Sequence, residues 1–232
     1  MNTDHNDMTE TSLDKLFDAL KGITNHKGRS ESPASEDKDP GKGTFLLVGL
    51  GNPGKEYRET RHNIGFMTAD RVAERLGIKF ARTQSKTLIT DARYSDHRIY
   101  LAKPQTFMNA SGQAVSALLK FYKIPYRNLL VVYDDVDLPF ETIRMKPSGG
   151  SAGHRGMQNI IQQIGTKEFP RLRLGVGRAY GSKQAADYVL KPFSKEELEF
   201  LSVYIDRAAD AALSYVTEGI EQTMTTYNRS EL

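Results

Sequence analysis

The sequence predicts an α/β protein: a three-layer sandwich with a mixed, mostly parallel sheet, preceded by a disordered N-terminal extension. Three observations lead to this fold class. From Thr44 onward, short apolar runs alternate with segments of helical periodicity. Two of these runs flank a polar turn at Ser95 and Asp96, as in an antiparallel hairpin, which makes the sheet mixed. Residues 26–43 contain no Leu, Ile, Val, Met or aromatic residue, so they cannot bury enough apolar surface to fold.

The first 43 residues are expected to lie outside the folded domain, which should occupy residues 44–232. Within this extension, residues 12–22 could form a short amphipathic helix, because Ser12 can cap it and its leucines share one face with Phe17. A helix of this length is marginal in water unless it packs against something. We therefore expect residues 1–43 to be disordered and of low complexity, with at most this short helix.

Elements of the folded domain follow from apolar periodicity and turn residues. An apolar strand is expected at residues 45–48, directly before a glycine-rich turn. Apolar residues at helical spacing predict two helices, with Ala69, Val72, Ala73 and Leu76 in the first and Val115, Leu118, Leu119 and Tyr122 in the second. Further strands are expected at residues 87–94, 97–102, 129–133, 142–146 and 172–176. A capping box, Ser194-x-x-Glu197, opens a C-terminal helix, whose apolar face consists of Leu201, Ile205, Ala208 and Ala212.

Composition limits the class of protein. The 232 residues include no cysteine, which excludes disulfides, thiolate nucleophiles and zinc–cysteine sites and fits a cytoplasmic location. No run of 18 apolar residues is present, so we expect no membrane-spanning segment. The net charge is +3, but nine of the 29 acidic and six of the 32 basic residues lie in the first 43, so the folded domain carries +6. This modest surplus suits contact with a phosphate backbone and is equally compatible with ordinary solubility.

The glycine turn GLGNPG at residues 49–54 matches the G-x-G-x-x-G pattern of dinucleotide-binding proteins and follows an expected strand. Its surroundings do not fit that function. A helix should begin within the motif and point its N-terminus at a pyrophosphate, but Pro53 and Gly54 indicate a turn. An acidic residue should end the next strand about 20 residues later, and residues 78–82 contain none. We therefore do not favour dinucleotide binding.

His62 is the residue best placed to act as a base. Of the five histidines, it alone lies just after a strand-end turn and just before an expected helix. The dipole of a helix N-terminus disfavours positive charge, which suits a neutral imidazole. A base also needs an acceptor that orients it, and Asp134 ends the expected strand at 129–133. Asp134 can meet His62 if this strand neighbours the first one; a histidine that only caps the helix is the alternative.

Four segments, taken in order, carry a resemblance to a known family. They are GLGNPG with RHN at residues 49–54 and 61–63, KPQTFMNASG at 103–112, VVYDDVDLP at 131–139 and SGGSAGHRG at 148–156. With these motifs and spacings, the chain closely resembles bacterial-type peptidyl-tRNA hydrolase over about residues 44–228. The resemblance implies hydrolysis of the ester between a peptide, or another N-blocked aminoacyl group, and the 3′-terminal ribose of tRNA, without metal or cofactor. Such an enzyme recycles tRNA from prematurely released peptidyl-tRNA.

The resemblance also implies roles for residues around the ester. His62 would activate a water molecule, with Asp134 hydrogen-bonded to it. Asn52 and Asn109 match the family's two site asparagines, which would position the substrate and stabilise the oxyanion through amide donors. Asn109 also lies where a helix is expected to begin, so a role as its N-cap is the alternative.

Other matched residues would bind the substrate. Phe107 and Met108 would form an apolar wall and Tyr57 matches a site tyrosine, although packing alone could explain each of them. At residues 153–156 the chain reads Gly-His-Arg-Gly, whereas many family members have asparagine in place of Arg155. Arginine donates hydrogen bonds but cannot accept them. Arg155 therefore cannot position water by accepting from it, but it can contact a phosphate or the peptide chain.

For the tRNA, Lys146 and Arg173 match the family's pair that holds the 5′ phosphate, and Arg144 shares a strand face with Lys146. Phosphate contacts of this kind position a substrate without reading its sequence. A solvated charge at a strand edge is the alternative for each residue. The resemblance implies contact mainly with the acceptor end of tRNA and the peptide backbone, and we expect a monomer.

Two other functions compete with this interpretation. Gly149-x-Ser151-x-Gly153 matches a serine-hydrolase elbow, but His154, the only later histidine, is too close in sequence to be the base of Ser151. A non-catalytic RNA-binding protein on the same scaffold is the second alternative, since a fold can be reused. All four matched polar site residues are present, which a protein without activity need not keep.

Overall fold

The structure is a computed structural model that describes residues 43–178 and 185–229. The expected extension, with its short helix at residues 12–22, therefore lies outside the described residues apart from Gly43. Within the described ranges, no helix is both long and apolar enough to cross a membrane.

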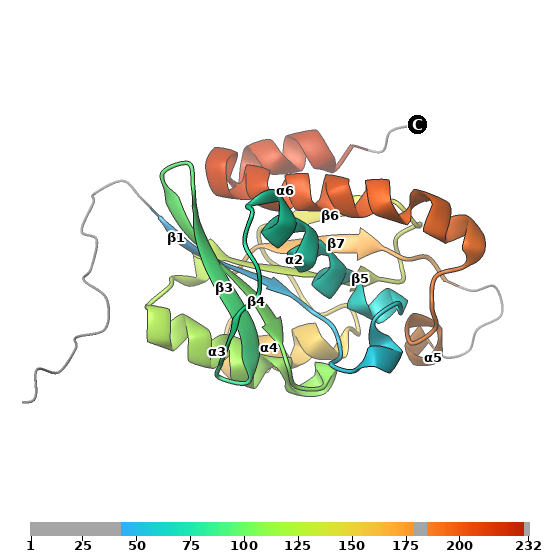
Figure 1. The fold of residues 1–232 in the computed structure, drawn as a ribbon, viewed down its shortest axis with the longest axis horizontal. Helices are drawn as coiled ribbons and strands as arrows, with labels where there is room; N and C mark the ends of the chain where they lie inside the picture. The colour runs from blue at the N-terminus through green and yellow to red at the C-terminus, as the bar shows by residue number, and fades with distance from the viewer. Residues whose placement is uncertain (1–42, 179–184, 230–232) are drawn as a thin grey trace, which may run out of the picture. The chain divides into compact units, whose positions relative to one another are not determined.

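A mixed sheet of seven strands forms the middle of the fold (Figure 1). Its order is β2-β3-β4-β1-β5-β7-β6. The strands are β1 (Thr44–Gly49), β2 (Arg82–Gln84), β3 (Thr87–Tyr94), β4 (His97–Pro104), β5 (Leu129–Asp135), β6 (Ile143–Lys146) and β7 (Arg171–Gly175). The central strands β4, β1, β5 and β7 are parallel, whereas β3 joins β4, β2 joins β3 and β6 joins β7 in antiparallel pairs. The predicted hairpin and the mixed sheet are both confirmed.

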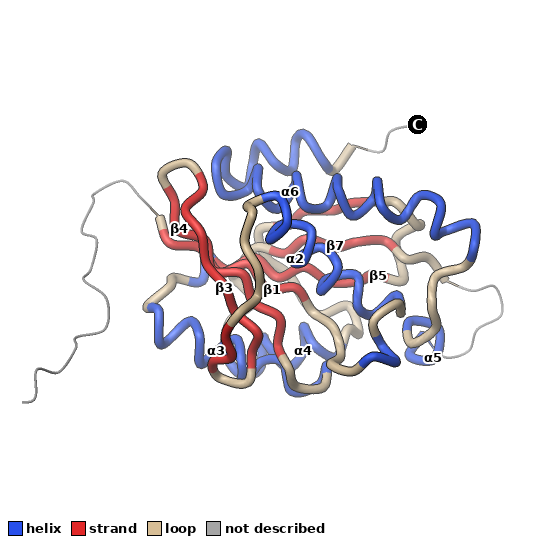
Figure 2. The backbone as a smooth tube through the Cα atoms, viewed as in Figure 1, coloured by secondary structure: helices blue, strands red, loops and turns tan. Residues whose placement is uncertain are grey.

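Helices cover both faces of the sheet, as predicted for a three-layer α/β fold (Figure 2). On one face lie α2 (Ile64–Arg75) and α6 (Lys195–Tyr227), and on the other lie α3 (Ser111–Tyr122) and α4 (Arg155–Ile164). Short elements complete the described chain: α5 (Ala185–Val189) and the 3₁₀ turns η1 (Lys55–Tyr57), η2 (Arg61–Asn63), η3 (Met108–Ala110) and η4 (Tyr126–Asn128). Helix α6 changes direction at Gly219, whose φ of 82° suits a residue without Cβ.

Two apolar cores lie on opposite faces of the sheet, because its central strands are buried on both sides. In β1, Leu46 and Val48 pack in the core under α3 and α4, whereas Leu47 packs in the core under α2 and α6. The expected core-facing residues of the helices are all buried or partly buried, and all except Ala69 belong to these two cores. The predicted capping box also forms: the Ser194 hydroxyl accepts from the Glu197 N–H at 3.2 Å, and the Glu197 carboxylate accepts from the Ser194 N–H at 2.6 Å.

Some elements differ from the prediction. Strands β4 and β5 continue beyond the expected ends at residues 102 and 133, so β5 includes Asp134. Strand β2 was not expected, because its three residues are polar and it forms only by pairing with β3. Helix α4 was not expected either, although Met157 and Ile160 are buried at helical spacing. This helix affects the site, because it begins directly after His154.

The glycine turn after β1 lets the backbone of α2 approach the sheet. A Cβ atom at Gly49 would lie 2.1 Å from the carbonyl oxygen of Gly65, and one at Gly65 would lie 2.4 Å from that of Val132 on β5. Any side chain at either glycine would therefore displace the start of α2. The glycines thus allow close helix–strand packing, which brings residues 61–63 to the carboxyl ends of β1 and β5.

Candidate active site

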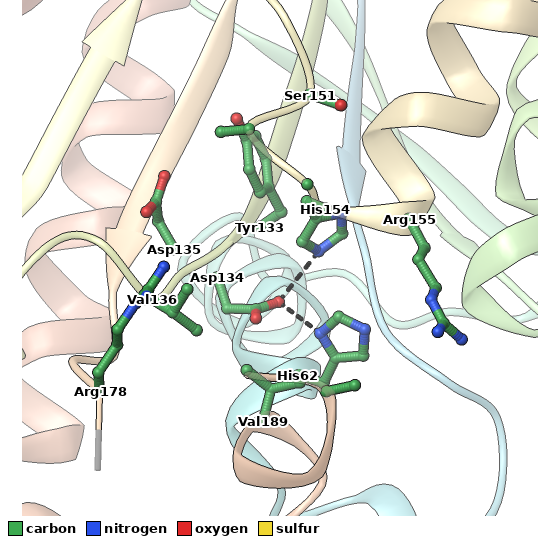
Figure 3. A pocket seen from close by; sticks show the side chains of 13 residues that line it. His62, Tyr133, Asp134, Asp135, Val136, Ser151, His154, Arg155, Arg178 and Val189 are labelled. Atoms are coloured by element: carbon green, nitrogen blue, oxygen red, sulfur yellow. Dashed lines mark hydrogen bonds and ion pairs between the residues drawn. The ribbon is translucent and has the colours of Figure 1, made fainter. Parts of the chain in front are cut away.

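The expected site lies where β1 and β5 end, at the edge of an α/β sheet where ligands commonly bind. Gly49 at the end of β1 pairs with Val132 of β5, so the loops that follow the two strands start close together. A pocket opens there, with walls from η2, β5, the loop before α4 and α5 (Figure 3). The residues that line it include His62, Tyr133, Asp134, His154, Arg155 and Val189.

His62 and Asp134 are in direct hydrogen-bond contact. The Nδ1 atom of His62, in η2, lies 2.8 Å from Oδ1 of Asp134. Asp134 is 3% exposed, whereas 12% of the His62 side chain is exposed. Strands β1 and β5 are neighbours, which was the condition for the two residues to meet. The sequence therefore placed this pair correctly, while its catalytic role stays a prediction.

A second histidine, His154, contacts the same carboxylate oxygen and was not expected there. Its Nε2 lies 3.2 Å from Oδ1 of Asp134, and its Nδ1 accepts from the N–H of Met157 at 3.2 Å as the N-cap of α4. His62 was expected to be the only histidine that lies both just after a strand-end turn and just before a helix, but His154 also directly precedes a helix, α4. The available signal was the helical spacing of apolar residues within 157–164, which predicts a helix that starts after His154.

These contacts fix the protons on both imidazole rings. A nitrogen that accepts from an N–H carries no proton, so neutral His154 holds its proton on Nε2 and donates it to Asp134. His62 donates from Nδ1 to the same carboxylate, which leaves its Nε2 as an acceptor. Among the described residues, none bonds to this Nε2. The two rings lie only 5.0 Å apart, yet His62 alone has a nitrogen ready to take a proton.

Asp134 is the anion of the site. Burial on its own would raise the pKa of its carboxyl group, but attraction to His62 and His154 and their hydrogen bonds outweigh burial and hold this pKa below its usual range. The neighbouring Tyr133 shows the opposite effect, because burial raises the pKa of its phenol to about 12. The Tyr133 ring contacts His154, with centroids 4.8 Å apart. Asp134 can therefore neutralise a proton that arrives on His62.

Asn52 is held so that its amide NH₂ group remains available. Its Oδ1 accepts from the N–H of Met108 at 2.8 Å. Its backbone N–H and carbonyl bond to the side chain of Asn63, at 2.8 and 3.0 Å. Because Oδ1 is engaged, the amide orientation is fixed, and Nδ2 is a donor without a partner among the described residues. Asn52 as a whole is 7% exposed, so little of this residue contacts solvent.

The turn η3 separates its residues by exposure. Met108 is buried, whereas Asn109 is exposed and Phe107 is 62% exposed. The alternative role of Asn109 as the cap of α3 was wrong, because the N-cap is Ala110 and no side chain bonds there. Phe107 therefore offers exposed apolar surface beside Asn109, whereas Met108 is buried and its backbone N–H fixes Asn52.

Tyr57 and Arg155 come from different elements, and only Arg155 lines the described pocket. Tyr57 is half-buried in η1, on the loop between Asn52 and His62. Arg155 is exposed at the start of α4, and Figure 3 shows its side chain beside the group of His62, Asp134 and His154, with no interaction drawn between them. Its guanidinium group forms no ion pair with any described residue. Arg155 thus adds a positive charge that the acids of the described pocket do not neutralise.

The basic residues expected to contact tRNA lie on β6 and β7. Lys146 is exposed at the end of β6. Arg173 pairs through Nε with Oδ2 of Asp135 at 2.6 Å. Arg144 is half-buried and donates to the backbone carbonyl of Asn228 at 2.5 Å. Lys146 is therefore the most accessible of the three, and the other two have partners within the protein.

The register of the sheet sets the distance between Lys146 and Asp134. Lys146 pairs with Arg171, whereas Asp134 pairs with Leu174 further along the same strand, β7. At about 3.3 Å per residue and 4.8 Å per strand, their Cα atoms lie roughly 10 Å apart along the strands and 10 Å apart across them. A substrate that contacts both must span roughly 14 Å at the level of the backbone.

The three residues His62, Asp134 and His154 also form a group whose ligand atoms lie within 4.8 Å of one another, close enough to hold a metal ion. A ligating histidine nitrogen must be unprotonated. Nε2 of His154 carries a proton as long as its Nδ1 caps α4, so metal binding would require loss of that cap. The group fits a hydrogen-bonded base better than a metal centre.

Comparison with known proteins finds relatives over most of the chain. The family model "Peptidyl-tRNA hydrolase" matches residues 46–232. The peptidyl-tRNA hydrolase of Chloroflexus aggregans is 49% identical over 185 residues, which cover 79% of this chain and 98% of the relative. The mitochondrial peptidyl-tRNA hydrolase of Oryza sativa subsp. japonica is 45% identical over 188 residues, which cover 81% of this chain and 75% of the relative.

Solved structures show the same similarity. The crystal structure of peptidyl-tRNA hydrolase from Acinetobacter baumannii matches with a TM-score of 0.75 and 35% sequence identity. The match covers 80% of this chain and 94% of that chain. The α/β fold predicted from the sequence is therefore shared with a protein of known structure.

Proposed function

Because this chain belongs to the peptidyl-tRNA hydrolase family, we propose that it cleaves peptidyl-tRNA at the ends of β1 and β5, with His62 as general base. The reaction is hydrolysis of the ester between the peptide and the 3′-terminal ribose of tRNA. One observation carries the assignment of the base: Nε2 of His62 has no partner within residues 43–178 and 185–229, while Nδ1 is bonded to a buried, ionised Asp134.

In the proposed reaction, Nε2 of His62 takes a proton from a water molecule while the water oxygen attacks the ester carbonyl carbon. The imidazolium that forms donates from Nδ1 to Asp134, whose negative charge stabilises it. The tetrahedral intermediate then breaks its bond to the ribose oxygen, and His62 returns the proton to that oxygen. The products are tRNA with a free hydroxyl and a peptide with a free carboxyl group.

Asn52 and Asn109 are assigned to the substrate carbonyl and its oxyanion. Nδ2 of Asn52 is oriented before the substrate arrives, because Oδ1 is bonded to Met108, so no reorganisation is needed when charge develops. Asn109 lies on the exposed turn beside Phe107, where its amide is accessible to a substrate. Loss of one oxyanion donor typically lowers turnover by about 10²–10³, which sets the scale for Asn52→Ala.

His154 is assigned to Asp134 rather than to proton transfer. Its Nε2 donates to Asp134 and its Nδ1 accepts from Met157, so neither nitrogen is free to take a proton from water. A second N–H donor on the carboxylate favours its ionised form and limits its rotation. His154 is therefore a positioning residue for the aspartate that in turn orients His62.

The substrate contacts remain proposals that the geometry supports to different degrees. Lys146 is exposed and can meet the 5′ phosphate, with Arg173 and Arg144 as its neighbours on β7 and β6. Tyr57, Phe107, Met108 and Arg155 are assigned to the acceptor end and the peptide backbone. The unpaired 3′ end of tRNA can cover the roughly 14 Å between Lys146 and the base. A monomeric state also remains a prediction.

The competing functions gain little support. Ser151 lines the pocket, but the histidine near it has both nitrogens engaged, so a serine nucleophile would lack a base. In Asn52 and His62, a hydrogen bond fixes the side chain and leaves one nitrogen, Nδ2 or Nε2, available to a substrate. A binding protein without activity has no need for this arrangement. The arrangement favours catalysis over binding alone.

The decisive experiment measures release of tRNA from an N-acetylaminoacyl-tRNA and from the same aminoacyl-tRNA with a free amino group. Both are assayed with and without EDTA, for wild type and for His62→Ala. We expect cleavage of the blocked substrate alone, unaffected by EDTA and reduced by about 10²–10⁴ in His62→Ala. Tight binding of tRNA without cleavage by the wild type would instead support the RNA-binding alternative.

A further inference from the structure

The turn that carries His62 is held by hydrogen bonds on two sides. We infer that Arg61 is a positioning residue for the base. This inference rests on the proposed role of His62. Asn63 links the turn to the loop that follows β1, because its side chain bonds both backbone groups of Asn52. Arg61 links the turn to the segment that joins α5 to α6. Arg61 is 6% exposed and Asn63 is 3% exposed, so solvent competes little with either connection.

The guanidinium group of Arg61 makes three hydrogen bonds. Nη1 donates to the carbonyls of Lys191 and Pro192, at 3.3 and 2.6 Å. Nη2 donates to Oε2 of Glu197 at 2.5 Å. The Cζ atom of the group lies over the Tyr188 ring, 4.4 Å from the ring centre. A lysine has neither the planar fork nor the flat face, so it cannot replace this set of contacts.

The segment that Arg61 holds is part of the pocket. Val189 of α5 lines the pocket together with His62 (Figure 3). The oxygen of Glu197 that accepts from Arg61 also accepts from the N–H of Ser194, in the capping box that opens α6. Arg61 therefore connects three parts of the protein: the turn that carries the base, the pocket wall and the first turn of α6.

This connection matters because Asp134 holds only one atom of the His62 ring. With Nδ1 as a fixed point, the direction of Nε2 still depends on where the backbone of the turn lies. A displacement of about 1 Å at a reacting group can lower turnover by roughly 10²-fold. Loss of Arg61 should therefore lower kcat, while contacts to tRNA on β6 and β7 stay in place.

The test compares Arg61→Ala and Arg61→Lys with Arg71→Ala, a matched control. Arg71 likewise forms an ion pair with an acidic residue of α6, Asp206, but it lies in the C-terminal half of α2, away from the His62 turn. Backbone contacts between residues 60–61 and 191–192 remain in every variant, so we expect each to fold. kcat and KM for N-acetylaminoacyl-tRNA are measured, with melting temperatures and with methylguanidinium as a rescue agent against KCl of equal ionic strength.

We expect kcat to fall by roughly 10–100-fold in Arg61→Ala, with KM changed by less than about twofold, and kcat to recover in part with methylguanidinium but not with KCl. Arg61→Lys should remain closer to the alanine variant than to wild type. Arg71→Ala should keep wild-type kcat. Unchanged kcat in Arg61→Ala, or an equal loss in Arg71→Ala, would overturn the positioning role while leaving the proposed function intact. Full activity of His62→Ala would instead overturn the proposed base itself.

Discussion

The carboxyl end of β1 and β5 and the edge formed by β6 and β7 hold their polar groups in different ways. In the first region, Asp134 and Asn52 are buried. The hydrogen bond of Asp134 to His62 leaves Nε2 of His62 available for the reaction, and the bond of Asn52 to Met108 leaves Nδ2 of Asn52 available. At the β6–β7 edge, Lys146 is exposed and its position depends on solvent and substrate. Fixed groups can favour a transition state over the ground state, whereas an exposed charge attracts a phosphate equally in both. Changes in the first region should therefore alter turnover, and changes at the edge should alter binding.

Asp134→Asn should produce the largest effect of the changes proposed in this comparison. Asparagine removes the charge that stabilises the imidazolium on His62, so we expect kcat to fall by about 10²–10⁴ while KM changes little. Single-turnover hydrolysis of N-acetylaminoacyl-tRNA measures the chemical step directly. A variant with normal single-turnover rate and weakened tRNA binding would break the division between the two regions.

Asp134 should also make stability depend on pH. Its pKa is lowered in the folded protein, so its contribution is present above the unfolded-state value of about 3.9 and is lost as the pH falls through the folded-state value. The difference in free energy of unfolding between wild type and Asp134→Asn should therefore be largest near pH 7 and smaller at pH values below about 4. Urea unfolding at both pH values measures it; a difference that does not vary with pH would show that the carboxylate adds no stability through its charge.

His154→Asn should produce an intermediate effect and separate the two tasks of this histidine. Asparagine is a good N-cap, so α4 should keep its stability, but its shorter side chain loses the contact with Asp134. We expect kcat to fall about tenfold, the scale of one hydrogen bond to a charged group, with little change in melting temperature. A loss as large as that of His62→Ala would mean that His154 takes part in proton transfer.

Lys146→Ala tests the other region. We expect KM to rise by roughly tenfold, the scale of one charge-assisted contact, with kcat unchanged and with a weaker dependence of KM on salt. The same variant should show no defect on a substrate that lacks the 5′ phosphate. An equal loss on both substrates would place the contact of Lys146 elsewhere on the tRNA.

The two regions also differ in how far the sequence predicted them. His62 and Asp134 could be paired in advance, because a buried apolar run predicts a strand and parallel neighbours bring their carboxyl ends together. Lys146 and Arg144 could be placed on one strand face from the period of two. What the pattern could not give is that Arg144 bonds to Asn228, since that contact joins residues far apart in sequence.

His154 and Arg171 show why other features escaped prediction. The contact of His154 with Asp134 depends on α4, a helix that was not predicted because a glycine-rich loop directly precedes it. Arg171 is 1% exposed and donates to the carbonyls of Gly149 and Gly150, which holds that loop in place. Nothing in the residue type predicts burial, because arginine is rarely buried without a carboxylate partner. Such contacts follow from tertiary packing rather than from local pattern.

Arg155→Asn should give the smallest effect and shows to which region Arg155 belongs. Arg155 lines the same pocket as His62, where its positive charge disfavours the imidazolium that forms during the reaction. If this repulsion outweighs any contact with the substrate, asparagine should raise kcat by about two- to threefold, which corresponds to less than 1 kcal/mol.

Arg155→Lys is the control, since it keeps the charge and should keep the wild-type kcat. A rise in KM in Arg155→Asn, with kcat unchanged, would instead assign Arg155 to substrate binding, so that a phosphate or a carboxylate of the substrate neutralises it. In that case the boundary between the two regions would run through the pocket, between His62 and the first residue of α4.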